Sequence, residues 1–483
     1  MKCNRVSCVF AITLVAAPMI GPVRADTLLL SDARIVNVEA GTVADGQSVL
    51  IRAGTIVAVG GDAASGIAED EAVVRHDADG GYLVPGLWDS HVHIFSSLAE
   101  PDWALSLYLL HGITGVRDMG ALWPIAEQKA LQDGIESGET LGPRLVLSGA
   151  WVDASPGSWP GMFLADTPEE AREVASTIAD EGWAAVKSYS MLDEPTYRAL
   201  AEAADGVGLP LVGHVPERVS LGTALDAGQN GMEHWGRVTM ACSTAEDAML
   251  DELREALEAG ADRSGVFAVM AKRNAIILDT WHEALCADVL ESMATAELHV
   301  SPTLVVADFY VGNRPEPDAP RMRMLPPALR ETWNRPDFRL EAMTDELREL
   351  ADASIALDRQ TFLMAYRAGV PILASSDASF ANPFLFHGAS LLDELDLYVA
   401  TGLTPREALL TATVTPPRFF GLSDQDGTIA PGRRADLVLL DGNPLDDLAT
   451  LRRPRAVIAN GRLLDRAELN ALGAKLLERG TPE

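Results

Sequence analysis

Short apolar runs typical of buried β-strands alternate with amphipathic helical stretches through the middle of this chain. Parallel strands joined by helices close most economically into a barrel when there are eight of them. An open doubly wound sheet is the alternative, but no glycine-rich phosphate or dinucleotide loop follows any of the runs. The sequence therefore predicts an α/β fold, a (β/α)8 barrel of the TIM type. The predicted strands are Leu83–His93, Gly112–Met119, Arg144–Trp151, Ala184–Ser190, Pro210–Val215, Gly231–Trp235, Val300–Val306 and Pro371–Ala378.

Shorter β-type runs, broken by Gly and Asp, fill both flanks of the predicted barrel. They occupy residues 26–82 and 425–465. Neither flank has enough strands for a good sandwich, so the simplest arrangement is one small β-sandwich domain assembled from both termini. The barrel then takes residues 83–424, and residues 466–483 form a C-terminal helix or tail.

Residues 1–25 have the layout of a secretory signal peptide. Lys2 and Arg5 precede an apolar stretch, and Val23-Arg24-Ala25 supplies small residues around a cleavage site. The apolar stretch is short for a membrane span, although an uncleaved N-terminal anchor is the alternative. No later segment is long and apolar enough to span a membrane. We therefore expect a periplasmic or secreted protein.

Net charge limits the binding partners to be expected, and the cysteine content limits the possible disulfides. The net charge of −32 repels phosphate backbones and anionic lipid, so nucleic acid and membrane surfaces are not expected partners. Cleavage after Ala25 leaves Cys242 and Cys286. In an oxidising compartment these two could pair, or they could remain buried thiols, and the sequence leaves both options open.

Two segments depart from the alternation of strands and helices. Residues 242–275 predict extra helix after the sixth strand, and residues 308–339 are rich in Pro and Arg after the seventh. Loops that follow barrel strands lie over the face where barrel enzymes keep their active sites. The second segment is therefore either a lid whose arginines meet a substrate carboxylate or a solvated surface excursion, and we favour the excursion.

Histidines and one aspartate stand at the ends of several predicted strands. His91 and His93 end the first strand, and side chains two apart on a strand point to the same face. His214 ends the fifth strand, and His234 ends the sixth. Asp377 ends the eighth, which barrel closure sets beside the first. Four imidazoles and a carboxylate at one end of a barrel form a convergent set of metal ligands.

A lysine ends the predicted fourth strand. Lys187 would point into the same barrel mouth, where an ammonium beside metal cations is electrostatically unfavourable. Reaction with CO2 would convert the amine into a carbamate, which is a carboxylate on a long stem that can bridge two cations. The alternative is an amine that reaches a neighbouring carboxylate, and the other ligand residues favour the carbamate.

Longer motifs around these residues resemble the amidohydrolase superfamily, in its imidazolonepropionase-like and dipeptidase (prolidase-like) branch. They are Val84–His93, Gly112–Gly120, Val186-Lys187 and Gly427–Leu437, the last being typical of the composite β domain of that family. The resemblance covers nearly all of the chain after residue 25. It implies a (β/α)8 barrel with one or two divalent metals.

The resemblance also implies roles for the candidate residues. Two divalent ions are expected, with zinc favoured for imidazole and carboxylate ligands. His91, His93 and Asp377 would hold the more buried ion, His214 and His234 the second, and carboxylated Lys187 would bridge both with a hydroxide. Asp377 would serve as general base. Tyr189 would face the same mouth and contact the oxyanion or a substrate carboxylate, or else simply fill the barrel end.

Three functions are compatible with this pattern. The first is an exported metal-dependent hydrolase that cleaves the amide of a dipeptide or N-acyl amino acid with the bridging hydroxide. The second is a one-metal deaminase or cyclic-amide hydrolase, because His214-Val215-Pro216-Glu217 resembles the His-x-x-Glu of those enzymes, in which Glu217 would move protons. Lys187 favours the first. The third is a metal-binding scaffold without turnover. The expected partners are a small-molecule amide substrate and, as an option, further copies of the chain.

Overall fold

The structure is a computed structural model, and part of the chain lies outside the residues that it describes. The predicted signal peptide at 1–25 is outside, as are 311–315, 317–318 and 336–343 of the Pro/Arg-rich segment and its continuation. The described residues are 27–97, 99–120, 122–155, 157–261, 263–310, 316, 319–335 and 344–480.

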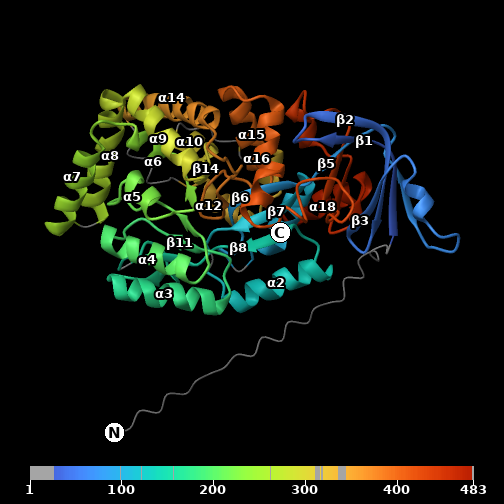
Figure 1. The fold of residues 1–483 in the computed structure, drawn as a ribbon, viewed down its shortest axis with the longest axis horizontal. Helices are drawn as coiled ribbons and strands as arrows, with labels where there is room; N and C mark the ends of the chain where they lie inside the picture. Colours follow the sequence, from blue (N-terminus) through green and yellow to red (C-terminus); the bar gives the residue numbers. More distant parts are fainter. Residues whose placement is uncertain are drawn as a thin grey trace, which may run out of the picture.

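A ring of parallel strands forms the centre of the molecule (Figure 1). Backbone hydrogen bonds join the separately paired strands, from Ala184 N to Leu147 O at 2.9 Å and from Asn230 N to Leu211 O at 2.8 Å. The ring closes where Ser90 N donates to Ala374 O at 2.9 Å. The barrel strands are β6 (Leu87–His93), β7 (Ile113–Asp118), β8 (Arg144–Leu147) with β9 (Trp151–Asp153), β11 (Val186–Ser188), β12 (Leu211–Gly213), β13 (Gly231–Glu233), β14 (His299–Ser301) and the run 371–379, which ends in β15 (Ala378–Ser379). A short strand, β10 (Phe163–Leu164), pairs with β9.

Helices surround the strands, and their ends follow local sequence signals. Thr167 and Glu170 form a capping box at the start of α3, and Gly182 ends that helix in the left-handed conformation. The helices that follow barrel strands are α1 (Pro101–Leu110), α2 (Ile125–Ser137), α3 (Pro168–Glu181), α4 (Glu194–Gly206), α5 (Leu221–Asp226), α6 (Gly236–Ala241), α9 (Glu283–Thr295), α10 (Val305–Tyr310), α11 (Pro320–Arg323), α12 (Pro327–Trp333), α14 (Asp345–Ala368), α15 (Ala389–Thr401), α16 (Pro405–Thr413) and α17 (Thr415–Phe419).

Strands from both ends of the chain make one further sheet, drawn in blue and red beside the barrel in Figure 1. Its order is β18-β17-β16-β5-β1-β2-β3, and β4 pairs with β1. The strands are β1 (Thr27–Asn37), β2 (Thr42–Arg52), β3 (Thr55–Gly60), β4 (Val74–Asp77), β5 (Tyr82–Pro85), β16 (Leu437–Leu440), β17 (Ala456–Ala459) and β18 (Arg462–Leu464). The short helices η1 (Ala63–Gly66) and η2 (Leu448–Arg452) and the C-terminal α18 (Arg466–Arg479) accompany them. The predicted fold class, a (β/α)8 barrel with a β domain built from both termini, is confirmed.

The structure divides what the sequence presented as one first strand. Residues 82–85 form β5 in the β domain, and the barrel strand β6 begins after Gly86. A side chain at Gly86 would come within 1.9 Å of Thr114 Oγ1, so the chain can pass from one sheet to the other only with glycine there. The predicted seventh strand also ends early, at Ser301, because α10 begins at Val305.

Extra helix follows the sixth strand, as the sequence predicted. It consists of α7 (Glu246–Glu258) and α8 (Arg263–Thr280), at the left of Figure 1. Cys242 and Cys286, at the two ends of this insertion, form a disulfide. Of the two options that the sequence left open, the structure shows the paired one. Within the described residues, no helix combines the length and the apolar character needed to cross a membrane.

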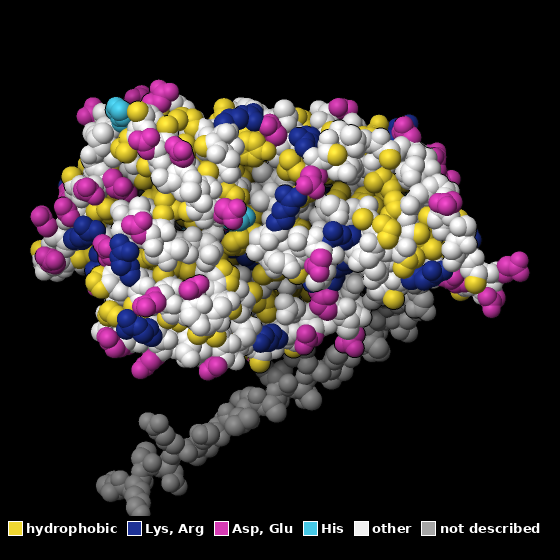
Figure 2. All heavy atoms as spheres, in the orientation of Figure 1, with side chains coloured by type: hydrophobic (Ala, Val, Ile, Leu, Met, Phe, Trp, Pro, Cys, Tyr) yellow, Lys and Arg dark blue, Asp and Glu magenta, His cyan; other side chains and the backbone are white. Residues whose placement is uncertain are grey.

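Acidic side chains are spread over the face shown in Figure 2 and do not gather in one patch. Lysines and arginines are scattered among them on the same face. The negative charge is therefore distributed over this surface, as expected of a charge that serves solubility.

Candidate metal centre

Two histidines and an aspartate converge where the first and last barrel strands meet. His91 and His93 lie at the end of β6, and Asp377 directly precedes β15, which pairs with β6. Asp377 N donates to His91 O at 2.8 Å, so the two strands hold these residues in register. The Nε2 atoms of His91 and His93 are 3.2 Å apart, and Asp377 Oδ1 lies 3.4 Å and 3.2 Å from them. These three residues could hold a divalent cation.

The other two predicted histidines continue this group. His234 follows β13, and its ring centroid lies 5.1 Å from that of His91. His214 follows β12, and its ring lies 5.0 Å from that of His234. The rings of His93, His91, His234 and His214 are therefore successive neighbours across the C-terminal end of the barrel.

Each of the four imidazoles is bonded to the protein through Nδ1. The contacts are His91 with Glu233 Oε2 at 2.8 Å, His93 with Gly120 O at 3.2 Å, His214 with Ser190 Oγ at 3.0 Å and His234 with Thr303 Oγ1 at 2.8 Å. A ligating histidine usually bonds its second ring nitrogen to the protein in this way, which fixes the ring and its tautomer. The pattern leaves Nε2 of each ring available to a cation, so the donor set fits the metal that the resemblance implies.

Two of the candidate ligands have left-handed backbone conformations. His234 has φ of 67° and Asp377 has φ of 54°. Residues other than glycine rarely adopt such angles, which cost about 1–3 kcal/mol each and persist only where the surrounding structure imposes them. Both residues stand where a barrel strand ends, so this strain lies at the predicted site.

Protonation also suits metal binding. Burial lowers the pKa of His91, His214 and His234, so the rings are neutral near pH 7, the form that binds a cation. Burial alone would raise the pKa of Asp377. Its interactions with His91, His93 and His234 outweigh burial and hold that pKa below its ordinary value. Asp377 is therefore an ionised carboxylate.

Lys187 faces the barrel interior. Its side chain is 1% exposed, Nζ donates to Met119 O at 2.6 Å, and Nζ lies 5.4 Å from the centroid of the Trp151 ring. Burial lowers the pKa of Lys187 to about 8, although the carboxylates of Glu233 and Asp377 act in the opposite direction. An appreciable fraction of the amine is therefore neutral near physiological pH, and the neutral amine is the form that can react with CO2.

Tyr189 lies beside the second pair of histidines. Its ring stacks on His214 with centroids 4.3 Å apart, and Trp159 Nε1 donates to its hydroxyl oxygen at 2.9 Å. Trp151 completes an aromatic group, with its ring 5.6 Å from Tyr189 and 5.7 Å from His93. Tyr189 thus contacts His214 as one member of a group of aromatic rings.

Glu217 is engaged by an arginine of the inserted helices. Arg273, from the inserted helix α8, forms an ion pair with Glu217 Oε2 and also donates to Glu217 O. The Arg273 side chain is 8% exposed and that of Glu217 is 19% exposed, so the pair is partly shielded from water. The second predicted function assigns proton transfer to Glu217, which would first have to leave this partner.

Sequence reasoning missed the buried charges beneath the histidines. Glu233 lies within β13 and Arg117 within β7, and both side chains are at most 1% exposed. The signal was present in the sequence, because a charged residue inside an apolar strand needs a partner in the barrel interior. Only the structure shows which partners these residues have.

The described part of the Pro/Arg-rich segment bonds to the outer parts of the molecule. Arg321 pairs with Asp393 at 2.9 Å, Arg335 pairs with Glu331 at 2.8 Å, and Arg330 donates to Gly480 O. Arg314 and Arg339 lie outside the described residues. The described arginines favour the surface excursion over the lid.

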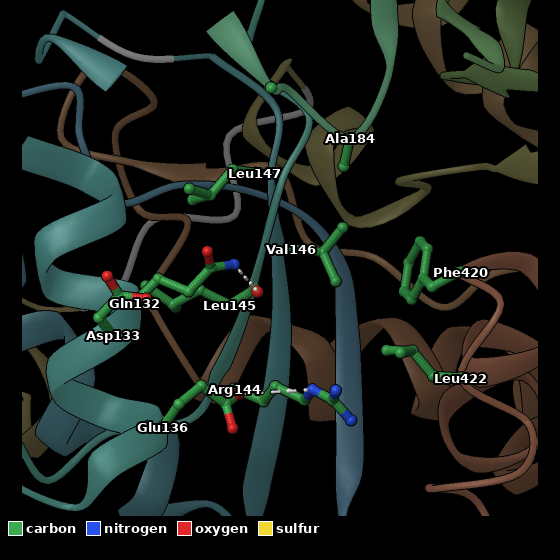
Figure 3. A pocket seen from close by; sticks show the side chains of 11 residues that line it. Gln132, Asp133, Glu136, Arg144, Leu145, Val146, Leu147, Ala184, Phe420 and Leu422 are labelled. Carbon is green, nitrogen blue, oxygen red and sulfur yellow. Dashed lines mark hydrogen bonds and ion pairs between the residues drawn. The ribbon is translucent and has the colours of Figure 1, made fainter. Parts of the chain in front are cut away.

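A pocket of about 360 Å³ lies along β8 (Figure 3). Gln132, Asp133 and Glu136 of α2 line one side, and Phe420 and Leu422 line the other. None of the candidate ligands is among its lining residues. This pocket is therefore separate from the candidate metal centre.

Comparison with known proteins places the fold and the family. A sequence model described as the Amidohydrolase family matches residues 82–464. An adenine deaminase of Nitratidesulfovibrio vulgaris (strain DP4) is 26% identical over 444 residues, which are 91% of this chain and 58% of the relative. Adenine deaminase 3 of Rhizobium meliloti (strain 1021) is 28% identical over 278 residues, 54% of this chain and 44% of the relative. The chain thus spans about half the length of these curated relatives, 58% of the first and 44% of the second.

Solved structures share the fold at lower identity. A bottromycin amidohydrolase superposes with a TM-score of 0.71 at 22% identity, covering 95% of this chain and 92% of the other. A putative prolidase from Bifidobacterium longum gives 0.64 at 23% identity, covering 94% and 99%. A Xaa-Pro dipeptidase with bound methionine gives 0.62 at 18% identity, covering 91% and 100%.

Proposed function

Because this chain belongs to the amidohydrolase family, we propose that it is a metal-dependent hydrolase that cleaves the amide bond of a dipeptide or an N-acyl amino acid. One observation carries the proposal. His91 Nε2, His93 Nε2 and Asp377 Oδ1 meet within 3.4 Å at the C-terminal end of the barrel, where enzymes of this fold keep their active sites.

A second cation is part of the proposal. The rings of His214 and His234 are neighbours of the first group, and Lys187 is buried close to the same charges. A carboxylated Lys187 would bring a negative charge where the ammonium now sits and would join the two halves of the ligand set. Imidazole and carboxylate donors suit zinc, and manganese or cobalt could substitute.

The chain's own residues have separate tasks in the proposed reaction. Bound divalent cations supply Lewis acidity, which polarises the amide carbonyl and lowers the pKa of water. Asp377, ionised at neutral pH, accepts the proton of the attacking water at Oδ2, because Oδ1 is the oxygen that faces His91 and His93, and it delivers that proton to the leaving amine. The Tyr189 hydroxyl, which accepts from Trp159 Nε1, would contact the substrate carbonyl or its carboxylate.

Export is also proposed. The signal-like segment at 1–25 supports it, and so does the Cys242–Cys286 disulfide, because disulfides persist mainly in oxidising compartments. The protein would therefore act in the periplasm or outside the cell, on small amides present there.

Deamination of an adenine-like ring is the second candidate, and the curated relatives favour it. In that reaction water replaces an exocyclic amine on a ring carbon, which the same cation and Asp377 could serve. The one-metal form that uses Glu217 is weakened by the ion pair between Glu217 and Arg273. A metal-binding scaffold without turnover is the third.

Metal analysis combined with a substrate panel tests the three candidates. The purified protein would be assayed with zinc, manganese or cobalt against dipeptides, N-acyl amino acids and adenine, beside Asp377→Asn and, as the matched control, the exposed Asp352→Asn. We expect amide hydrolysis that chelation abolishes, a loss of about 10²–10⁴-fold in kcat for D377N, and none for D352N. Adenine turnover without amide hydrolysis would establish the second candidate, and cation binding without any turnover the third.

A further inference from the structure

A buried ion pair lies directly behind the first metal-binding histidine. Glu233 Oε2 lies 2.8 Å from His91 Nδ1, while its other oxygen, Oε1, accepts from Arg117 Nη2 at 2.8 Å. The Glu233 side chain is 0% exposed, and those of His91 and Arg117 are 1% exposed. The carboxylate therefore joins the imidazole to a guanidinium in the interior of the barrel.

Arg117 is itself held by several strands. Its Nε donates to Ser90 O on β6 at 2.6 Å, and Nη2 also donates to Ser301 Oγ on β14 at 3.0 Å. The rings of Phe419 and Phe420 lie 5.7 Å and 5.5 Å from its guanidinium carbon. The ion pair between Arg117 on β7 and Glu233 on β13 thus crosses the barrel interior and holds the carboxylate in one position.

Stability alone does not account for this ion pair. A buried pair recovers little more than the desolvation of its charges, and well-packed apolar residues of similar volume usually serve stability as well. Arg117 Nη1 also lacks a hydrogen-bond partner among the described residues, which adds to that cost. The benefit should therefore lie in what the pair does to its neighbour.

That neighbour is a histidine whose orientation matters. Glu233 accepts from Arg117, which is always protonated, so Glu233 acts as an acceptor toward His91 as well. His91 must then carry its proton on Nδ1, which leaves a lone pair on Nε2. This Nε2 is the atom that meets His93 Nε2 and Asp377 Oδ1. The Nδ1 atoms of the other three histidines contact a carbonyl or a hydroxyl, so among the described contacts only the Nδ1 of His91 has a carboxylate partner.

We propose that Glu233, held in place by Arg117, is a positioning residue that fixes the tautomer and ring orientation of His91 and strengthens Nε2 as a metal donor. This inference rests on the proposed metal dependence. It adds two residues from different strands to the site, neither of which touches substrate. Partners of this kind typically change metal affinity by about 10–100-fold.

The first test is a metal titration of Glu233→Gln, with zinc in competition with a chromophoric chelator. Gln keeps the shape of the side chain but removes the negative charge. We expect zinc affinity at the tighter site to fall about 10–100-fold. With cobalt in place of zinc, the visible absorption spectrum of the site should also change, because the orientation of one ligand is no longer fixed.

The matched control is Glu394→Gln. Glu394 is also 0% exposed, but it accepts from the backbone N–H groups of Leu304 and Val305 at 2.8 Å and 2.6 Å and touches none of the four histidines. E394Q should lower the thermal midpoint and leave zinc affinity within about two-fold of the unchanged protein. A loss in E394Q as large as that in E233Q would attribute the effect to general destabilisation and overturn the proposal.

A double variant guards against misfolding of E233Q, which leaves Arg117 buried without its partner. Arg117→Met combined with Glu233→Gln removes both charges. Its thermal midpoint should recover toward that of the unchanged protein while its zinc affinity stays low. Recovery of zinc affinity in the double variant would show that the carboxylate is not needed. Because the readout is metal binding, it stays informative even if no amide is hydrolysed and the proposed function fails.

Discussion

Removal of the disulfide should destabilise the protein by an amount that the structure allows us to estimate. Cys242 and Cys286 are both fully buried and are 44 residues apart in the sequence. The loop they close contains α7 and α8. The loss of chain entropy in the unfolded state for a loop of this length corresponds to about 4 kcal/mol at 25 °C. The bond therefore accounts for a large share of the 5–15 kcal/mol typical of folded domains.

The assay is guanidinium unfolding of the native protein and of the double variant Cys242→Ala/Cys286→Ala, each with and without a reductant. The reductant should lower the midpoint of the native protein toward that of the variant and leave the variant unchanged. Zinc binding should persist in the variant, because neither cysteine contacts a candidate ligand. Two results would refute the reasoning. One is that Cys242 and Cys286 of protein made under oxidising conditions both react with a thiol reagent after unfolding. The other is that the reductant does not change the guanidinium midpoint of the native protein.

Two further predictions concern single side chains. Lys187→Met should reduce the number of bound cations from two to at most one and abolish the carbamate signal in ¹³C NMR with labelled bicarbonate. The control variant Lys272→Met, at an exposed lysine, should change neither. An unchanged number of bound cations in Lys187→Met would remove Lys187 from the ligand set. Burial raises the pKa of Asp358 from 3.8 to about 6, so stability that this group contributes at low pH is lost as pH rises through 6. Asp358→Asn still accepts from Thr239 Oγ1, and it should prevent up to about 3 kcal/mol of the fall in unfolding free energy between pH 4 and 7. Urea titrations across this pH range would compare it with the exposed Asp352→Asn. Equal pH profiles of the two variants would contradict the assignment.

Much of the candidate site could be predicted because barrel geometry converts sequence position into spatial position. A residue that ends a parallel strand lies at one end of the barrel, so His214, His234 and Asp377 could be grouped before any contact was known. The first strand was overextended because β5 and β6 form one apolar run in the sequence, and only the crossing at Gly86 separates them. An apolar run predicts that a strand is buried, but it does not predict to which sheet the strand belongs.

Contacts between distant strands were beyond that reasoning. The pairing of Glu233 with Arg117 joins residues 116 positions apart, and the disulfide joins two cysteines across an insertion of helices. Periodicity carries information about one element at a time, whereas such contacts depend on the radius and stagger of the closed barrel.

The sequence by itself determined the alternation of strands and helices, the placement of His, Lys and Asp at strand ends, and hence the family and the kind of chemistry. The tertiary structure decided how those side chains face one another. It anchors each imidazole through Nδ1, buries Lys187 in the barrel interior, pairs Glu217 with Arg273 and sets a charged pair behind His91. The physical reason is that strand position fixes where a backbone ends, while hydrogen bonds from neighbouring strands fix where a side chain points.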